Sequence, residues 1–426
     1  MSLSRPIVVL LLCMRLHAQP LTLQDCLRLA VAAPSSVSLA RQESEIARHG
    51  VTQARARFLP QTHVTTGFVY NSPRRDDRST FSFIPLNAVR EYIGLFSAGQ
   101  EFDTSGRLRA ELARARAGRD AAGANLAIAQ RELKRAVTTA YYRALLTRRL
   151  AAVTNHALAE SESFEKRTRL LFEAGESAKA DLVKASAQTA FLRQSLNATE
   201  LEARTASMEL ASFWTREVAA PLELADVLDQ PAPELEASLE SGPGAAPAAG
   251  FLRRLEFNFL DAQKRGFTAE ARREKAALYP QASLIFQYGI DSVAVRARDR
   301  GYAAYINLNI PVFDWFKARS ATRQFEFRVQ QVETSRAITE RTFSKEYETA
   351  LARVRQFHAQ ISLTRAQTDL AQEDLKLSRV RYEGGEGSAL DVVTAQNGLA
   401  QARANYYTSV ANYLNARVDL EVASGR

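Results

Sequence analysis

The residue with the clearest chemical context in this chain is the aspartate of the tetrapeptide Ser388-Ala389-Leu390-Asp391. A serine followed three residues later by an acidic side chain matches a helix capping box, with aspartate in the place usually held by glutamate. A carboxylate in the first turn also interacts favourably with the helix macrodipole. From the residues alone, Asp391 is therefore expected to cap a helix that begins near Ser388.

The other chemically versatile residues form no recognisable site. The histidines lack the spacing of metal ligands, and no Ser-His-Asp order, phosphate loop or cysteine pair stands out. The only cysteines are Cys13 and Cys26, and Cys13 lies in a predicted leader, so no disulfide framework is expected. We therefore predict no enzyme, no catalytic residue, no metal site and no cofactor. The five histidines are His17, His49, His63, His156 and His358.

Residues 1–18 are predicted to be an export signal peptide. Arg5 supplies a positive charge, Ile7 to Met14 forms a short apolar core, and Leu16-His17-Ala18 is a plausible cleavage site. An ordinary N-terminal strand or anchor is the alternative. No long uninterrupted apolar run follows, which leaves a soluble periplasmic protein, a secreted protein or an outer-membrane β-barrel.

The chain is basic, with a formal net charge of +9. A basic surface can bind nucleic acid, but an exported protein rarely meets it, so no nucleic-acid partner is predicted. The arginine cluster is interpreted as a solvated helix face, with a contact to anionic lipid head groups of the outer membrane as the alternative. The cluster consists of Arg107, Arg109, Arg114, Arg116 and Arg119.

Internal repetition is the main organising signal. Three landmarks recur in the same order about 210–220 residues apart, which indicates a duplication. The repeats are predicted to span 19–228 and 251–426, joined over 229–250 by a linker rich in proline and glycine. The landmarks are the Pro-Gln pairs before β-like stretches, Pro60-Gln61 and Pro280-Gln281; the Phe-Asp pairs before long helices, Phe102-Asp103 and Phe313-Asp314; and the glycine turns at Gly175 and Gly385.

Each repeat is expected to contain one very long helix without proline, about Gly106 to Phe172 and about Lys317 to Tyr382. At about 1.5 Å per residue each spans roughly 100 Å, a length typical of coiled coils and tube walls. Shorter returning helices complete hairpins at about 106–214 and 317–424. Two further helices, about Leu23 to Phe58 with a break at Pro34 and about Phe251 to Leu278, precede the strands.

The last helix carries a heptad seam that predicts coiled-coil packing. Its positions alternate steps of three and four residues. They are Leu390, Val393, Asn397, Ala400, Ala404, Tyr407, Ala411, Leu414 and Val418.

Four strands are predicted, in pairs at about 61–98 and 281–313. The first pair comprises Gln61 to Tyr70 and Ala88 to Phe96; the second comprises 282–291 and Ala304 to Val312. The second pair alternates apolar and polar residues, which fits lipid on one face and water on the other, with a sheet packed on soluble helices as the alternative. Candidate interfacial aromatic residues are Phe68, Tyr70, Phe96, Tyr288, Tyr302 and Tyr305.

Four strands cannot close a barrel, and open sheet edges are not tolerated in lipid. A membrane-embedded sheet of this size therefore requires oligomerisation. Three copies would supply twelve strands and a closed ring.

In this order, these motifs resemble the TolC-like outer-membrane efflux protein family. The resemblance covers nearly the whole mature chain and includes its opening, Leu21 to Leu27, and its closing stretch, Tyr413 to Leu420. It implies a mainly α protein with membrane β-structure: a homotrimer with a coiled-coil tunnel in the periplasm and a twelve-stranded barrel in the bacterial outer membrane. It also implies two protein partners, a periplasmic adaptor (membrane fusion) protein and an inner-membrane transporter.

The resemblance assigns roles to particular residues. The glycine turns and their neighbours would form the adaptor-docking tip, namely Gly175, Glu176, Gly385, Glu386 and Gly387. Asp391 would help to constrict the tunnel mouth, where three symmetry-related carboxylates would raise one another's pKa and favour cations. Asp181 is its first-half counterpart, and Thr394 replaces a second aspartate, so a less acidic gate is expected.

The function predicted on this basis is an exit duct of a tripartite efflux pump, passively exporting small molecules or metal ions. A periplasmic coiled-coil adaptor or scaffold is the alternative from another class of protein. Such an adaptor would show one hairpin and a lipoyl-like or barrel β-domain, whereas this sequence shows two hairpins and two strand pairs. Within the channel interpretation, a type I protein secretion duct is the alternative.

Overall fold

The computed structural model describes residues 20–74, 77–82, 89–228 and 250–425. The predicted signal peptide and residues 229–249 of the predicted linker lie outside them. The described residues form two compact units, each drawn from both halves of the sequence. We call the described part of 1–35, 131–248 and 346–424 the hairpin unit, and that of 36–130 and 249–345 the sheet unit.

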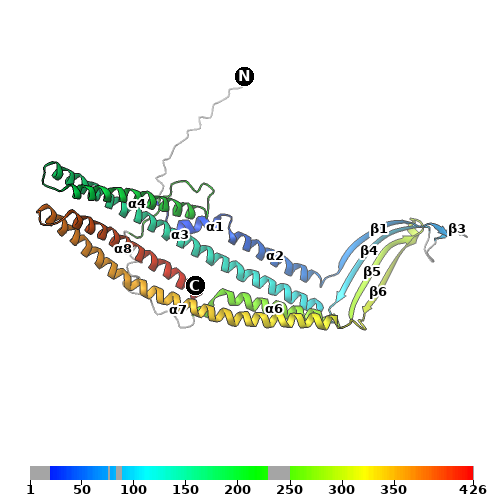
Figure 1. Cartoon of the computed structure of the whole chain (residues 1–426). Helices are drawn as coiled ribbons and strands as arrows, with labels where there is room; N and C mark the ends of the chain where they lie inside the picture. Colours follow the sequence, from blue (N-terminus) through cyan, green and yellow to red (C-terminus); the bar gives the residue numbers. More distant parts are fainter. Residues whose placement is uncertain (1–19, 75–76, 83–88, 229–249, 426) are drawn as a thin grey trace, which may run out of the picture. The chain divides into compact units, whose positions relative to one another are not determined.

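Two 67-residue helices, α3 (Arg107–Glu173) and α7 (Lys317–Glu383), begin in the sheet unit and continue into the hairpin unit (Figure 1). Each measures about 100 Å, as the sequence predicts. In the hairpin unit they are followed by the returning helices α4 (Lys179–Ala211) and α8 (Ala389–Ala423), which makes two helical hairpins. The short helix α1 (Leu23–Ala32) completes this unit.

The core of the hairpin unit joins all four long helices. Phe164 of α3, Ala185 of α4, Leu375 of α7 and Val392 of α8 belong to one buried cluster. Small residues such as Ala185 allow the helix backbones to approach closely.

The predicted heptad seam of α8 is correct only in part. Val393 and Leu414 are buried, but Leu390 is 50% exposed and Asn397 is also exposed. Because α8 contributes to a core shared by four helices, its buried surface is wider than the single stripe of a two-stranded coiled coil.

The segment after α4 is fixed to the beginning of the described chain and to α3. Leu21 forms a parallel bridge with Leu224, and the Tyr141 hydroxyl donates a hydrogen bond to the Ala225 carbonyl oxygen at 2.7 Å. Cys26 is a free cysteine fully buried in α1. Burial raises the pKa of its thiol to about 11, so the thiol stays protonated and is a poor nucleophile at neutral pH.

The sheet unit contains α2 (Ser36–Ala56), α6 (Leu255–Ala276) and a four-stranded antiparallel sheet. The strand order is β1-β4-β5-β6, with β1 (Gln61–Tyr70) and β6 (Arg300–Asn309) at the edges. The expected helix break at Pro34 is confirmed, because α1 ends at Ala32 and α2 begins at Ser36. Smaller elements are the hairpin β2 (Pro73–Arg74) with β3 (Asp77–Ser82) and the 3-10 turns η1 (Gly250–Arg253) and η2 (Ala297–Asp299).

The bounds of β4 and β6 differ from the predicted Ala88 to Phe96 and Ala304 to Val312, since the strands begin at Arg90 and Arg300. β4 spans Arg90–Phe102 rather than ending at Phe96, because it is a central strand and β5 (Gln281–Ser292) pairs with it as far as Phe102. β6 ends at Asn309 rather than Val312, because Asn309 pairs with Gln281, the first residue of β5.

The register places even-numbered residues of all four strands on one face. The pairs Phe68–Tyr92, Phe96–Tyr288 and Leu284–Ile306 lie directly opposite each other. By the same register Tyr305 lies on the opposite face, so it does not belong with the other predicted interfacial aromatic residues. The exposed large apolar residues of this face are Val64, Phe68, Tyr70, Phe96, Phe102, Leu284, Phe286, Tyr288, Tyr302, Ile306 and Leu308.

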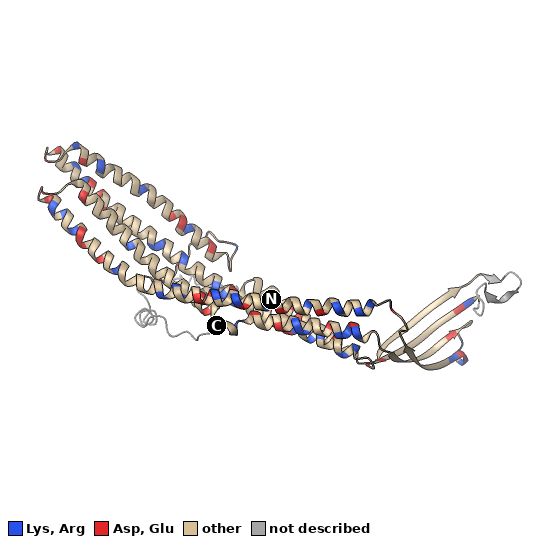
Figure 2. Cartoon of the chain, turned by 60° about the horizontal axis from the view of Figure 1, so that its bottom comes forward, with Lys and Arg blue, Asp and Glu red and all other residues tan. Residues whose placement is uncertain are grey.

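Charged residues are confined to the ends of these four strands. Figure 2 shows Lys, Arg, Asp and Glu spread along the helices, whereas the strands are mostly free of them. Glu101 lies at the helix-proximal end, and the others lie at the opposite end of the sheet. Those others are Arg90, Glu91, Asp291 and Arg300. An uncharged band therefore crosses the sheet between its two charged margins.

Gly289 permits the close contact between the two central strands. Its φ is +154°, and a Cβ added there would lie 2.0 Å from the Gly94 carbonyl oxygen. A strained backbone alone usually costs about 1–3 kcal/mol. We predict that Gly289→Ala lowers the free energy of unfolding by more than this, because β4 and β5 would also have to separate. Thermal unfolding followed by circular dichroism in detergent measures this effect.

Gly301→Ala is the matched control. Gly301 pairs directly with Gly289, but an added Cβ there meets nothing within 4 Å. Equal thermal stability of the two variants would contradict the predicted clash.

Candidate functional site

The first hairpin turn ends α3 with a Schellman motif. The Gly175 N–H donates to the Phe172 carbonyl at 3.0 Å, and the Glu176 N–H donates to the Leu171 carbonyl at 2.8 Å. The motif requires a left-handed residue, and Gly175 supplies it with φ +81°. Glu176 is thereby held in an exposed position at the turn.

The second hairpin turn repeats this geometry. The Gly385 N–H donates to the Tyr382 carbonyl at 3.1 Å, the Glu386 N–H donates to the Arg381 carbonyl at 2.9 Å, and Gly385 has φ +77°. Gly387 adds a third bond to the Arg381 carbonyl at 3.0 Å. The two turns therefore present equivalent exposed glutamates, as the internal repeat predicts.

The returning helices begin differently in the two halves. In α8 the predicted capping box is confirmed: the Ser388 N–H and hydroxyl each donate to Asp391 Oδ2 at 2.9 Å, and the Asp391 N–H donates to Ser388 Oγ at 3.3 Å. In α4 the N-cap is Ala178, which has no side-chain hydrogen bond. The duplicated hairpins are thus equal at their turns and unequal at the next helix start.

The pKa of Asp391 lies below its ordinary value. The causes are the hydrogen bonds from the Ser388 backbone and side chain, followed by the nearby positive charge of Arg381. Asp391 is exposed and therefore ionised at neutral pH. A single chain thus presents a negative charge at the start of α8.

The other predicted constriction residues lie on the same stretches of α4 and α8. Thr394 is exposed one turn after Asp391, whereas Asp181 of α4 is half-buried. Two turns further along, the Gln188 amide donates to Asn397 Oδ1 at 2.6 Å and links the two returning helices. Within the described chain, no hydrogen bond or ion pair joins Asp181 to Asp391.

One residue of this region was missed by the sequence reasoning. Lys184 is exposed and lies three residues after Asp181, as Thr394 lies three residues after Asp391. The repeat spacing was sufficient to identify it, since both pairs are offset equally. The first-half counterpart of the gate therefore carries one acidic and one basic side chain.

The paired landmarks of the sequence lie where strands and helices meet. Gln61 Nε2 donates to the Ala56 carbonyl at 2.8 Å, and Gln281 Nε2 donates to the Ala276 carbonyl at 3.2 Å. Each glutamine thereby satisfies a carbonyl at the C-terminus of the helix that precedes its strand. In the sequence these glutamines serve only as markers of the repeat. The structure shows that both cap the C-terminus of the preceding helix.

The Phe-Asp pairs cap the long helices. Asp103 accepts hydrogen bonds from the Leu108 and Arg109 N–H groups at 2.8 and 3.2 Å. Gly106, which lies between Asp103 and these two residues in the sequence, has φ +81°. The carboxylate satisfies N–H groups that have no partner within the first turn of α3.

Asp314 does the same for α7. It accepts hydrogen bonds from the Phe316 and Ala318 N–H groups at 3.1 and 2.8 Å. Here Trp315 and Phe316 adopt positive φ values of 54° and 64°. Bulky residues rarely adopt this conformation, which costs on the order of 1–3 kcal/mol each.

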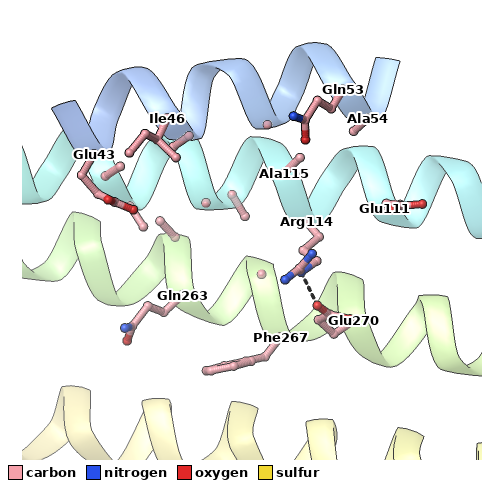
Figure 3. Close-up of a pocket in the computed structure, with 18 of the residues that line it drawn as sticks. Glu43, Ile46, Gln53, Ala54, Glu111, Arg114, Ala115, Gln263, Phe267 and Glu270 are labelled. Atoms are coloured by element: carbon pink, nitrogen blue, oxygen red, sulfur yellow. Dashed lines mark ion pairs between the residues drawn. The ribbon is translucent and has the colours of Figure 1, made fainter. Parts of the chain in front are cut away.

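A groove in the sheet unit has a volume of about 750 Å³ and is lined by α2, α3, α6 and α7. In Figure 3, Arg114 of α3 points toward Glu270 of α6, with which it forms an ion pair. Much of the remaining wall consists of alanine and glycine. Ala117 and Gly266 face each other there, since a Cβ added to Gly266 would lie 3.7 Å from the Ala117 Cβ. The sequence reasoning missed this groove, because the small residues that open it lie on four separate helices.

Among the described residues, no group of three or more His, Cys, Asp or Glu side chains could hold a metal ion. Over the same residues, no helix is sufficiently long and apolar to span a membrane.

Comparison with solved structures identifies the fold. The chain superposes on the outer-membrane protein VceC of Vibrio cholerae with a TM-score of 0.82 and 16% identity, covering 95% of this chain and 96% of that one. It superposes on the MtrE outer-membrane channel of Neisseria gonorrhoeae with a TM-score of 0.80 and 19% identity, covering 95% and 88%. Long helical hairpins joined to a four-stranded sheet are therefore the fold of outer-membrane channels.

Sequence comparison identifies the family. Residues 27–215 and 253–426 match the family model described as outer membrane efflux protein, and the chain belongs to this family. Relatives include Nodulation protein T of Rhizobium leguminosarum bv. viciae, 24% identical over 91% of this chain and 78% of the relative. The pyoverdine export outer membrane protein OpmQ of Pseudomonas aeruginosa is 24% identical over 82% and 73%.

Family membership fixes the type of activity. The protein is an exit duct of the outer membrane that acts in efflux, with its helical part in the periplasm, and it is not an enzyme. A duct needs no reacting side chains. This is consistent with Asp103, Asp314 and Asp391, whose observed role is to cap helices.

Removing the cap of α8 tests the inequality between the hairpins. We predict that Ser388→Ala weakens the start of α8 by about 1 kcal/mol, the usual value of an N-cap. Amide hydrogen exchange in the first turn of α8 is expected to accelerate about fivefold. Ala178→Ser, which would create a Ser-x-x-Asp box before Asp181, is the control and is expected to slow exchange at the start of α4.

The same capping box predicts a pH dependence. Since the folded-state pKa of Asp391 is lowered, its stabilising effect is complete above the unfolded value of about 3.9 and is lost as the pH falls through the folded value. In Ser388→Ala this dependence should be smaller. Identical exchange profiles across acidic pH in wild type and variant would show that the hydrogen bonds contribute nothing.

Proposed function

We propose that three copies of this chain associate through the edges of their sheets into a closed twelve-stranded barrel. The observation that carries this proposal is a sheet whose outer strands, β1 and β6, each lack a second partner strand in the described part of the chain. The apolar face of this sheet has charged residues only at the strand ends. In lipid, backbone groups along a free edge have no water to bond, so strands form closed barrels. The ten to thirteen residues of the four strands are also suitable, since about 9–11 tilted residues span a bilayer.

In this assembly the helical hairpins form a duct into the periplasm, and their turns form its tip. The duct takes cargo passively from an inner-membrane transporter through a periplasmic adaptor protein. The relative OpmQ is named for pyoverdine export. By this likeness, small molecules are the class of cargo we propose, with metal ions as a second class.

Asp391 is the proposed centre of the constriction. Its exposed carboxylate is fixed by the Ser388 box at the start of α8, and three-fold symmetry would bring three such groups together. Mutual repulsion would then raise their pKa values above the lowered value of a single chain, and the ring would favour cations. Asp181, offset by Lys184, contributes less negative charge to the same region.

Channel recordings test the duct and its gate together. We expect wild type to run as a heat-dissociable trimer in detergent and to form channels of low resting conductance in planar bilayers. Asp391→Ala should raise the resting conductance and reduce block by divalent cations, because the carboxylate ring is lost. Thr394→Ala, one turn further along the same exposed stretch, removes no charge and should change the cation block little.

Two results would contradict this function. A soluble monomer would exclude the trimeric duct. Unchanged resting conductance and cation sensitivity in Asp391→Ala would exclude the gate but leave the duct intact.

The turns at Gly175 and Gly385 are the proposed adaptor-docking tip, with Glu176 and Glu386 as flanking contacts. We expect the double variant Glu176→Lys, Glu386→Lys to weaken adaptor binding about tenfold, which corresponds to about 1.4 kcal/mol. Pull-down with the adaptor of the same pump, together with drug accumulation in cells, measures the loss. Glu200→Lys, an exposed charge reversal along α4, is the control, and an equal loss there would show that the turns have no special role.

A further inference from the structure

The turn between β6 and α7 exposes a cluster of three aromatic side chains. Phe313, Trp315 and Phe316 are 62%, 83% and 61% exposed. The Phe313 ring centroid lies 4.8 Å from that of Trp315 and 6.1 Å from that of Phe316, each with an edge-to-face geometry. We call these three residues the aromatic turn. They pack on one another rather than into the core of the sheet unit.

The backbone of the aromatic turn is suited to glycine rather than to bulky residues. Trp315 and Phe316 both have positive φ, and the equivalent turn before α3 uses Gly106 for this conformation. Both turns serve the same local purpose, since Asp103 and Asp314 each cap the following helix. Capping alone therefore does not explain why two aromatic residues occupy a strained position in the second turn.

The aromatic turn continues the apolar face of the sheet. Ile306 and Leu308 on that face of β6 are exposed, and so are Ile310 and Val312, which follow the strand. Exposed apolar residues thus continue along the chain from β6 to Trp315. Trp and other aromatic side chains with an amphipathic environment concentrate where a bilayer meets water.

The charges beside the two turns also differ. At the start of α3, Arg107 pairs with Glu101 at 2.5 Å and Arg109 pairs with Asp103 at 2.6 Å. At the start of α7, Lys317 and Arg319 are exposed, and neither forms an ion pair with another described residue. Two uncompensated cations next to aromatic rings are complementary to anionic phospholipid head groups.

We propose that the aromatic turn is a membrane anchor that lies in the head-group region of the periplasmic leaflet, with Lys317 and Arg319 contacting anionic phospholipid. This inference rests on the proposed function, because it requires the apolar face of the sheet to face lipid. Each chain carries one such anchor, since the first-half turn has Ser105 and Gly106 in place of the aromatic pair. A trimer would therefore be held at three points around its base.

The chain allows a direct test, because Trp214 and Trp315 are its only tryptophans. Full-length Trp214→Phe, reconstituted in vesicles of phosphatidylglycerol and phosphatidylcholine, reports on Trp315 alone. We expect its fluorescence to be quenched by lipids brominated near the head group and to be protected from aqueous iodide. Trp315→Phe, which reports on Trp214 in the hairpin unit, is the matched control and should show no quenching by brominated lipid.

A second comparison tests the lipid preference. Brominated phosphatidylglycerol should quench Trp315 more strongly than the same fraction of brominated phosphatidylcholine. Lys317→Gln with Arg319→Gln, made in the Trp214→Phe background, should bring this ratio close to one. A ratio that is unchanged by the double substitution would overturn the role of the two cations.

Conductance of the same vesicles separates this inference from the proposed duct. Channel activity with Trp315 open to iodide and unquenched by brominated lipid would overturn the anchor and leave the duct intact. Channel activity with Trp315 shielded from both quenchers would place the aromatic turn against a second copy of the chain and would also overturn the anchor. Absence of channel activity together with absence of lipid quenching would overturn both.

Discussion

The hydrogen-bonding groups along the outer edges of β1 and β6 are the constraint on which the rest of the structure depends. Among the described strands, β4 and β5 are paired on both sides, whereas β1 and β6 are each paired on one side only. The register also places apolar residues of all four strands on one face. In water that face is unfavourable, and in lipid the open edges are unfavourable, so neither solvent suits one sheet alone. Association of several sheets edge to edge meets both requirements at once.

Duplication supplies the same junction chemistry twice. Gln61 and Gln281 satisfy carbonyls of the preceding helices, and Asp103 and Asp314 cap the following ones. Gly175 and Gly385 end the long helices with the same pair of hydrogen bonds, to which Gly387 adds a third in the second turn. These junctions are places where backbone groups cannot be satisfied by regular structure. Few side chains can meet each need, which explains why these residues still mark the repeat while the helices between them differ.

The same physical distinction explains how much could be predicted from the sequence. The long helices, the break at Pro34 and the Ser388 box follow from local rules of periodicity, proline geometry and capping, and the structure confirms them. The ends of β4 and β6 could not be predicted locally, because each is set by where the partner strand begins or ends. The buried face of α8 depends on three neighbouring helices, and the groove beside Arg114 and Glu270 depends on four, so a heptad pattern within one helix identifies neither.

The two repeats differ in charge at the starts of α4 and α8, which a three-fold assembly would bring close together. In the first, Asp181 follows an uncapped alanine and is followed by Lys184, whose charge offsets it. In the second, Ser388 holds Asp391 in an ionised state and Thr394 adds no charge. A proposed ring of six returning helices would therefore alternate between nearly neutral and acidic positions, with Lys184 offsetting three of the six carboxylates. Repulsion is easier to accommodate when only the three Asp391 carboxylates lack such an offset, and Lys184 lies on the intervening helices to lessen it. The inequality of the repeats thus limits the charge that a narrow constriction would have to accommodate.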